Sequence, residues 1–227
     1  AKVPFVKCGD FDPKKKGFVP VIEGGEGLLH TVNRITIFCM RFQEKILPGN
    51  AVKEKLDEKV KAVEQAENRT VGRKERQELK DEVIFSLLPV ALLKSSRVYA
   101  MFDAETNFLH VDSSSPGRAE DIISELRESA GGLKVRMVQT AVSPIKFLTD
   151  TLKETPEGVG KLVTGNDLSL FNPSDESKVR FSDWDLASEE VATQLNAGLA
   201  VSCVTMCWDD RINFQIDGDL VLKKLKF

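Results

Sequence analysis

The stretch from residue 50 to residue 93 constrains the fold most, because its apolar residues follow a helical period yet form only a narrow stripe. In "AVKEKLDEKVKAVEQAEN" (residues 51–68), the apolar stripe consists of Val52, Leu56, Val60 and Val63. Their spacing of four, four and three places them on one face of an α-helix. Asn50 is predicted to cap the start of this helix.

A second helix is predicted from about Gly72 to just before Pro89, where proline interrupts the pattern. Its apolar face consists of Leu79, Val83, Ile84, Leu87 and Leu88. The two segments together indicate a helical hairpin, or one long interrupted helix. The charged half of the second segment has few apolar residues to bury, so its role must come from its charges.

Charged residues on the second helix are separated by sign. The basic face consists of Arg73, Arg76 and Lys80. The opposite, acidic face consists of Glu75, Glu78 and Glu82. A cationic stripe of this kind suits a run of phosphate groups, and Arg69 extends it if the helix begins earlier. The alternative is that the arginines pair with Glu64 and Glu67 across the hairpin, and spacing alone slightly favours that pairing.

The rest of the chain alternates hairpin-like strand pairs with helices, which indicates the α+β class with antiparallel sheets. Residues 1–34 are rich in Gly, Pro and Lys and are predicted to be mostly loops. Residues 97–140 read as a β-β-α-β unit, whose last strand is "LKVRMVQT" (residues 133–140). Residues 143–154 form a short helix. The last third contains strands at 160–171 and 178–186, a helix at 188–198, and a meander at 199–227.

Three regions follow from this pattern. Residues 1–48 and 94–160 form a central α/β region, residues 49–93 form the projecting helical hairpin, and residues 161–227 form a second α+β region.

Charge is unevenly distributed along the chain, since residues 1–80 have a net charge of +5 and residues 81–227 a net charge of -8. A basic third permits a localised surface for anions.

Candidate enzyme chemistry is sparse. No G-x-G-x-x-G, P-loop or H-E-x-x-H motif occurs, and we expect no cofactor and no metal. A nuclease needs clustered carboxylates for divalent metal ions. The weak candidates are Asp183 with Asp185 on one predicted strand face, Asp217 with Asp219 around a turn glycine, and Asp57. Turn chemistry or surface charge is the favoured explanation for each of these. Two smaller basic spots exist, at Lys14–Lys16 on a predicted loop and at Lys223, Lys224 and Lys226 on the last strand.

Several ordered motifs resemble the RdgC family of bacterial recombination-associated proteins. They are "EKILP" (residues 44–48), "VKEKLDEKV", "RKERQELKDEV", "SLLP", "VDSSS", "AEDIISELRES", "DLASEEVATQLNAG", "DDRINF" and "LKKLKF". Family members usually begin with a further strand-bearing segment and continue past the last motif. We therefore expect this chain to be a truncated or partly ordered member, or a divergent relative.

The resemblance implies an α+β protein that forms a ring-shaped homodimer around double-stranded DNA. It also implies DNA binding without sequence preference, antagonism of the RecA recombinase, and a cytoplasmic, nucleoid-associated location without a membrane partner. Single-stranded DNA is a further candidate ligand. Combined with the charge pattern, the resemblance favours DNA contacts from Arg69, Arg73, Lys74, Arg76 and Lys80, supported by Lys53, Lys55 and Lys59.

Two other hypotheses remain open from the sequence. The first is a metal-dependent exonuclease that acts on DNA. The second is a protein-interaction module without DNA binding, which the acidic remainder of the chain favours. We expect a non-enzymatic protein, because no catalytic constellation accompanies the basic stripe.

Overall fold

The computed structural model describes residues 4–227 and divides into two compact units, one ending at Val135 and one beginning at Arg136. The described chain is α+β, with two antiparallel sheets and five α-helices. Each unit contains one sheet and its own hydrophobic core. None of the helices in this part of the chain combines the length and apolar character that crossing a membrane requires.

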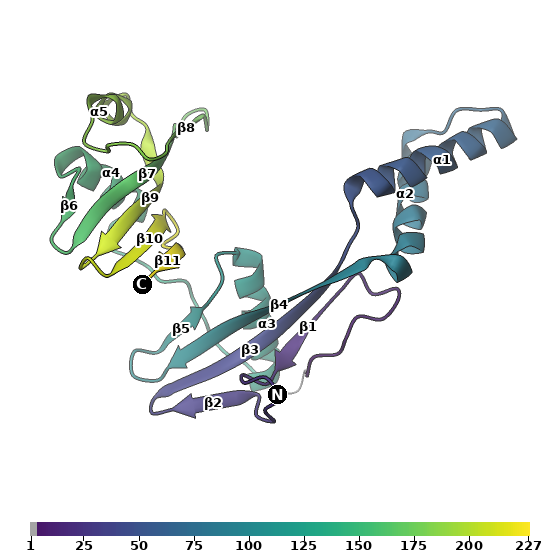
Figure 1. The fold of residues 1–227 in the computed structure, drawn as a ribbon, viewed down its shortest axis with the longest axis horizontal. Coiled ribbons are helices and arrows are strands. Elements are labelled where there is room, and N and C mark those ends of the chain that lie inside the picture. Colours follow the sequence, from purple (N-terminus) through teal and green to yellow (C-terminus); the bar gives the residue numbers. More distant parts are fainter. Residues whose placement is uncertain (1–3) are drawn as a thin grey trace. The chain divides into compact units, whose positions relative to one another are not determined.

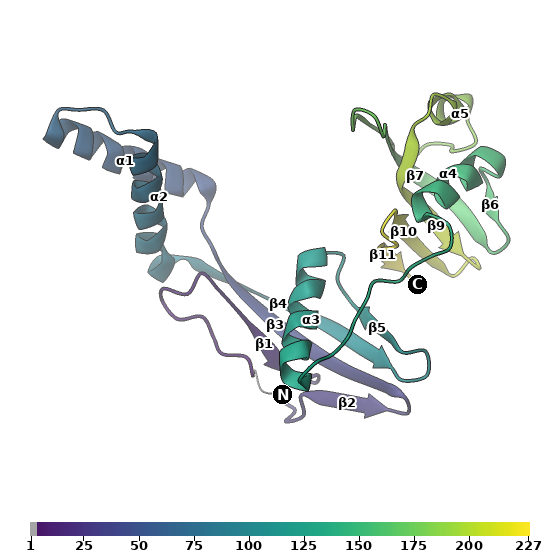
Figure 2. The same cartoon turned by 180° about the vertical axis from the view of Figure 1, so that it is seen from behind.

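The first unit is built on a sheet with strand order β1-β3-β4-β5, and β2 pairs with β3. The strands are β1 (Lys14–Val19), β2 (Leu29–Val32), β3 (Ile35–Ile46), β4 (Leu92–Asp103) and β5 (Phe108–Val111). Helix α3 (Pro116–Ala130) lies across one face of the sheet (Figure 2). The core beneath α3 consists of Phe18, Phe38, Met40, Val98, Ala100 and Ile122. Because side chains alternate along a strand, the residues between these positions lie on the opposite face of the sheet.

The long strands β3 and β4 run side by side and lead directly into and out of the helical hairpin (Figure 1). The hairpin consists of α1 (Gly49–Glu67), α2 (Arg73–Leu87) and the short 3₁₀ turn η1 (Leu88–Val90). Asn68 ends α1 in the left-handed conformation, with a φ of 49°. This matches the known tolerance of asparagine for that region.

The hairpin has a small core of its own. Leu56 and Val60 of α1 pack against Leu79 of α2, and the partly buried Val63 and Val71 complete the cluster. The predicted stripe and the predicted second helix are therefore confirmed. The predicted N-cap is wrong, because α1 begins at Gly49 after Pro48, and no side chain caps its first amides.

The base of the hairpin is fixed by the segment that precedes β1. The Phe11 and Phe85 rings stack with their centroids 4.7 Å apart. The Lys45 ammonium donates a hydrogen bond of 2.7 Å to the carbonyl of Leu88, at the end of α2. These contacts join the helices to the sheet only at their root.

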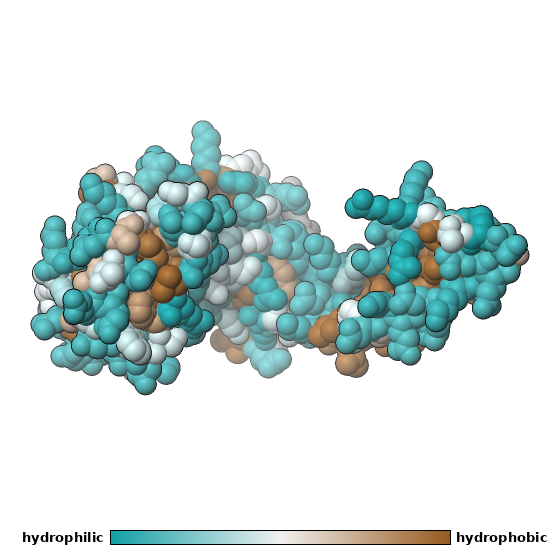
Figure 3. All heavy atoms as spheres, turned by 90° about the horizontal axis from the view of Figure 1, so that it is seen from above, coloured by the Kyte–Doolittle hydropathy of each residue, from teal (hydrophilic) through white to brown (hydrophobic). Residues whose placement is uncertain are grey.

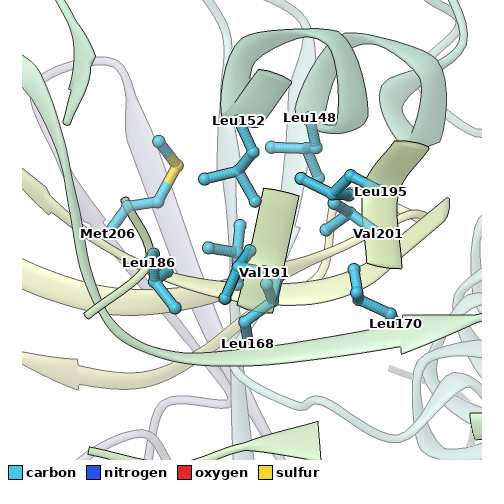
Figure 4. Close-up of a cluster of buried hydrophobic side chains, with 10 residues drawn as sticks. Leu148, Leu152, Leu168, Leu170, Leu186, Val191, Leu195, Val201 and Met206 are labelled. Atoms are coloured by element: carbon cyan, nitrogen blue, oxygen red, sulfur yellow. The ribbon is translucent and has the colours of Figure 1, made fainter. Parts of the chain in front are cut away.

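The second unit has strand order β11-β10-β9-β7-β6, and β8 pairs with β7. Its elements are α4 (Pro144–Glu154), β6 (Gly158–Val159), β7 (Leu162–Phe171), β8 (Lys178–Phe181), α5 (Glu189–Asn196), β9 (Ala200–Trp208), β10 (Ile212–Asp217) and β11 (Leu222–Lys226). Leucines of α4 and α5 face the central strands β7 and β9 in the core of this unit (Figure 4). Its fully buried members are Leu168, Leu170, Val191, Leu195, Val201 and Val204.

Three predictions about local structure are wrong. Residues 133–140 form no strand, so the predicted β-β-α-β unit lacks its last member. Met137 is 74% exposed there, because no neighbouring strand offers backbone partners. Residues 14–19 and 29–32 are strands rather than loops. The strand predicted at 178–186 ends at Phe181, since Asp183 has a φ of 50° that a strand does not accommodate.

Candidate nucleic-acid interface

The two helices of the hairpin enclose a groove of about 600 Å³, here called the hairpin groove. Its floor is apolar and includes Leu47, Val52, Leu56 and Ile84. Its lining also contains four cationic side chains, namely Lys53, Arg73, Arg76 and Lys80. Figure 3 shows a mostly hydrophilic hairpin surface with hydrophobic residues in narrow strips between. The groove therefore combines a small apolar surface with concentrated positive charge.

The basic face predicted on α2 contributes three of the four cations. Arg73, Arg76 and Lys80 recur at helical spacing and line the same groove. Lys53 joins them from α1, so the groove brings together residues 20 or more positions apart in the sequence. Lys74 lies on α2 outside the lining and is exposed. Lys55, Lys59 and Arg69 are also absent from the groove lining.

Ion pairs divide the eight predicted contact residues into two groups. Arg69 donates to both oxygens of Glu75, at 2.6 and 2.7 Å, and to Glu67. Lys55 pairs with Glu58, and Lys59 pairs with Glu82 on the facing helix. Arg76 pairs with Asp57 at 2.5 Å. Within residues 4–227, no ion pair involves the four other members, Lys53, Arg73, Lys74 and Lys80.

The predicted pairing of the arginines with Glu64 and Glu67 across the hairpin is wrong, since the arginine that pairs across the helices is Arg76, with Asp57. Glu67 does pair with Arg69, but Glu64 accepts a hydrogen bond from the backbone amide of Val71 instead. The hydrogen bond from Arg69 lowers the pKa of Glu75, and the same bonds raise the pKa of Arg69. Glu75 therefore neutralises Arg69 away from the groove, whereas Arg73 and Lys80 have no acidic partner within the part of the chain that the structure describes.

The hairpin as a whole is neutral, since residues 49–88 contain nine basic and nine acidic residues. Its cationic character depends on the segregation of these charges. Four of the nine acidic residues, Glu58, Glu67, Glu75 and Glu82, pair with basic residues outside the groove, and Asp57 pairs with Arg76. In residues 4–227, the other four acids make no ion pair. Exposed ion pairs contribute only about 0.2–1 kcal/mol, so a phosphate group can compete with Asp57 for Arg76.

The candidate nuclease carboxylates lie in separate places. Asp183 and Asp185 follow β8 in a turn, and Asp185 accepts a hydrogen bond from the amide of Ala187. Asp217 accepts from the amides of Asp219 and Val221 and pairs with Lys223 at 2.6 Å. The predicted shared strand face of Asp183 and Asp185 is therefore wrong. No group of three or more metal-binding side chains occurs in residues 4–227.

Neighbouring acids pair with three of the six lysines in the two smaller basic spots, and Lys14, Lys224 and Lys226 have no ion pair in residues 4–227. Lys16 lies on β1, not on a loop as predicted, and its ammonium bonds to Asp121 of α3 at 2.7 Å. Lys15 pairs with Asp12. Lys223 pairs with Asp217 on β10. These contacts leave the hairpin groove as the main concentration of unpaired positive charge among the predicted residues.

Comparison with known proteins supplies the family. The model of the family described as "Putative exonuclease, RdgC" matches residues 1–227. The chain belongs to the RdgC family. It is 34% identical over 228 residues to the recombination-associated protein RdgC of Halorhodospira halophila, covering all of this chain and 75% of that protein. The RdgC protein of Pseudomonas syringae pv. tomato is 35% identical over 230 residues, with the same coverage of both chains.

A further relative, the recombination-associated protein RdgC of Pseudomonas aeruginosa, is 37% identical over 201 residues, which are 88% of this chain and 65% of that protein. The suspected family is thus confirmed, and the chain is a member of a family of recombination-associated proteins. The names of these relatives refer to recombination, and the family description refers to an exonuclease.

Sequence reasoning missed two features of the RdgC-family fold. It did not predict the apolar floor of the hairpin groove, because Leu47 precedes the first helix and meets Ile84 of the second helix only in the folded chain. It also assigned no role to Arg41 and Arg97, which lie directly opposite one another on β3 and β4. The regular alternation of residues 35–46 and 97–103 signals a strand pair, but only the register brings the two arginines together.

Proposed function

We propose that this RdgC-family protein binds double-stranded DNA without sequence preference, through the cations of the hairpin groove and the neighbouring Lys74. The observation that carries the proposal is the group of unpaired cations, Lys53, Arg73, Lys74 and Lys80, within one hairpin. Arg76 adds a fifth contact when a phosphate displaces Asp57. The paired residues Arg69, Lys55 and Lys59 contribute a weaker, longer-range electrostatic attraction for DNA.

Backbone phosphates suit this arrangement better than base edges do. Lysine and arginine side chains neutralise phosphates and release bound counterions, which makes the affinity fall steeply with salt. Phosphate contacts carry no base information, so affinity is nearly independent of sequence. Four contacts give a slope of about −3.6 in a plot of log affinity against log salt concentration. A duplex lies across the rim of the groove, since the groove itself is too small to admit it.

We further propose that two copies form a ring-shaped homodimer that encircles the duplex, and that the bound ring opposes loading or action of the RecA recombinase. Membership of the RdgC family supports this, as does the association of its relatives with recombination. Single-stranded DNA is a secondary ligand under this proposal. The corresponding location is cytoplasmic and nucleoid-associated. Encirclement provides retention on DNA without a tight local contact, which fits the modest number of unpaired cations.

The proposal is tested by neutralising three groove cations in the variant Lys53→Gln, Arg73→Gln, Lys80→Gln. Binding of two fluorescent duplexes of unrelated sequence is measured by anisotropy at several salt concentrations. While Arg76 stays paired with Asp57, the slope is expected to change from about −3.6 to about −0.9, because Lys74 alone keeps its contact. Between 50 and 200 mM salt, the wild-type affinity then falls roughly 150-fold and that of the variant roughly 3- to 4-fold.

A matched control comes from Lys61→Gln. Lys61 is exposed on α1, has no ion pair in residues 4–227, and does not line the groove. The control is expected to change the salt slope by less than the value of about 0.9 that corresponds to one phosphate contact. If the triple variant keeps the wild-type slope, or if Lys61→Gln alters it as strongly per charge removed, the groove is not the DNA contact surface.

A second candidate function is exonuclease activity, which the description of the family model favours. It predicts degradation of linear duplex DNA in the presence of Mg²⁺ or Mn²⁺, with loss of activity in the variant Asp183→Asn, Asp185→Asn. Intact substrate after prolonged incubation with either ion removes this candidate. The remaining alternative, a protein-interaction module without DNA binding, is supported if no complex with duplex DNA forms at low salt.

A further inference from the structure

A second cationic site lies on the sheet of the first unit, away from the hairpin. Met40 and Phe42 face α3, so Arg41 between them faces the opposite side of the sheet. Its direct partner across the β3–β4 pair is Arg97. Both arginines line a pocket of about 360 Å³, here called the sheet pocket. Its other lining residues are Val19, Pro20, Ile22, Glu23, Gly24, Ser95 and Ser96.

Two arginines directly opposite on adjacent strands are unfavourable, because like charges repel at this separation. The surrounding contacts fix both side chains in place. Arg41 donates to the Ser95 hydroxyl at 3.3 Å and stacks over Phe5. Arg97 donates to the Pro20 carbonyl and to the Cys39 sulfur. Both guanidinium groups are therefore oriented beside the pocket in spite of their repulsion.

The pair has little compensating negative charge. In residues 4–227, the one ion pair of these arginines joins Nη1 of Arg97 to Oε1 of Glu23 at 3.8 Å. This distance exceeds that of a normal hydrogen bond. The Glu23 side chain is 96% exposed, and Gly24 and Gly25 follow it in the chain. Glu23 is thus a loosely held carboxylate next to a site that has two positive charges.

We propose that the sheet pocket binds a phosphate group between Arg41 and Arg97, and that Glu23 is an internal anion which the phosphate displaces. Nη1 of Arg97 makes no hydrogen bond in the described chain and is free to donate. The Ser95 hydroxyl provides a further donor beside Arg41. A phosphate dianion matches two guanidinium groups better than one distant carboxylate does, because guanidinium groups bind phosphate oxygens in a bidentate manner.

The phosphate has two sources with the same chemistry, a backbone phosphate of DNA or the phosphate of a small molecule. The DNA source rests on the proposed function, whereas phosphate binding in the sheet pocket does not. The site is separate from the hairpin groove, so its loss and the loss of groove contacts are measured independently. As a DNA contact, it would add a second anchoring point on the unit that contains the hairpin.

The direct test is a titration of the ¹⁵N-labelled protein with inorganic phosphate, followed by the backbone amide NMR signals. Ionic strength is held constant with chloride. The amides of Ser95, Arg97 and Gly24 are expected to shift saturably with phosphate and not with chloride. Arg41→Gln and Arg97→Gln should each weaken phosphate binding at least 5-fold. Arg136→Gln, an exposed arginine without an ion pair in residues 4–227, is the matched control and should leave binding unchanged.

Glu23→Gln provides a gain-of-function variant that loss of folding cannot imitate. Because the variant removes the competing carboxylate, phosphate affinity is expected to rise about 1.5- to 5-fold. Phosphate binding in the sheet pocket would be refuted by any of three results. These are amide shifts that do not saturate, identical shifts with chloride, or equal phosphate affinities of wild type and Arg41→Gln. An affinity that falls in Glu23→Gln would overturn the role of Glu23 as a displaceable anion.

DNA binding then identifies the source of the phosphate. If a backbone phosphate occupies the pocket, the salt slopes of the wild type and of the groove triple variant should each be steeper by about one than the groove contacts and Lys74 alone give, and Arg41→Gln should remove this excess in both proteins. An unchanged slope together with saturable phosphate binding assigns the pocket to a small phosphorylated ligand. Phosphate binding by a protein that fails to bind DNA would refute the proposed function and retain the pocket.

Discussion

Removing the acid that neutralises Arg76 should strengthen DNA binding. Asp57→Asn replaces the carboxylate that lies 2.5 Å from the Arg76 guanidinium by an amide of the same shape. Both side chains are exposed, at 45% for Arg76 and 41% for Asp57, so the pair contributes only about 0.2–1 kcal/mol to folding. The fold should therefore survive the substitution, and Arg76 becomes available to a phosphate.

The expected gain in DNA affinity follows from the free energy of the Arg76–Asp57 ion pair. At fixed low salt, release from the ion pair should raise the affinity for duplex DNA about 1.5- to 5-fold. A fifth phosphate contact should also steepen the salt slope from about −3.6 to about −4.5. Fluorescence anisotropy of a labelled duplex, measured from about 50 to 200 mM salt, provides both quantities.

Glu58→Gln is the matched control, because it removes one negative charge from the adjacent position of α1. Its partner Lys55 lies outside the hairpin groove. The control is expected to raise affinity slightly through the overall charge and to leave the slope unchanged. If Asp57→Asn and Glu58→Gln change slope and affinity equally, the reasoning that Arg76 acts from the groove is refuted.

Two further predictions concern the second unit, which contains both tryptophans of the chain, Trp184 and Trp208. Leu195→Ala should lower the free energy of unfolding of this unit by about 2–5 kcal/mol, because Leu195 is 1% exposed in the core. Tryptophan fluorescence in denaturant measures this change, and a loss under about 1 kcal/mol would contradict the packing. Burial raises the pKa of Asp217, but hydrogen bonds from Lys223 and two backbone amides outweigh it and leave this pKa below its usual value. The stability from Asp217 is therefore present above the unfolded pKa of about 3.9 and is lost as pH falls through the folded pKa. Asp217→Asn should flatten the fall in melting temperature below about pH 4, and an equally steep fall in the variant would refute this.

Much of the hairpin was predictable because its determinants are local. Val52, Leu56 and Val60 follow a helical period, and they are buried as expected. The shared face of Arg73, Arg76 and Lys80 depends only on spacing within one helix. The addition of Lys53 depends on how α1 crosses α2, which the local pattern does not encode.

The failed predictions share a different cause. Residues 133–140 have strand-like composition, but a strand requires a partner edge, and no neighbouring strand supplies one here. Lys14–Lys16 look like a loop until β1 pairs with β3, which places Lys16 beside α3. The opposition of Arg41 and Arg97 depends on the β3–β4 register over 12 residue pairs. These features arise from tertiary pairing between distant segments, so composition and periodicity do not reveal them.

The most direct measurement for the central claim compares retention on closed circular DNA and on the same DNA made linear. The protein is bound at low salt, transferred to high salt, and the mass of the protein and of its DNA complex is determined in solution. A dimer that stays on the circle and leaves the linear molecule through its ends would support a ring closed around the duplex. A monomer, or equal loss from both forms of DNA, would contradict it.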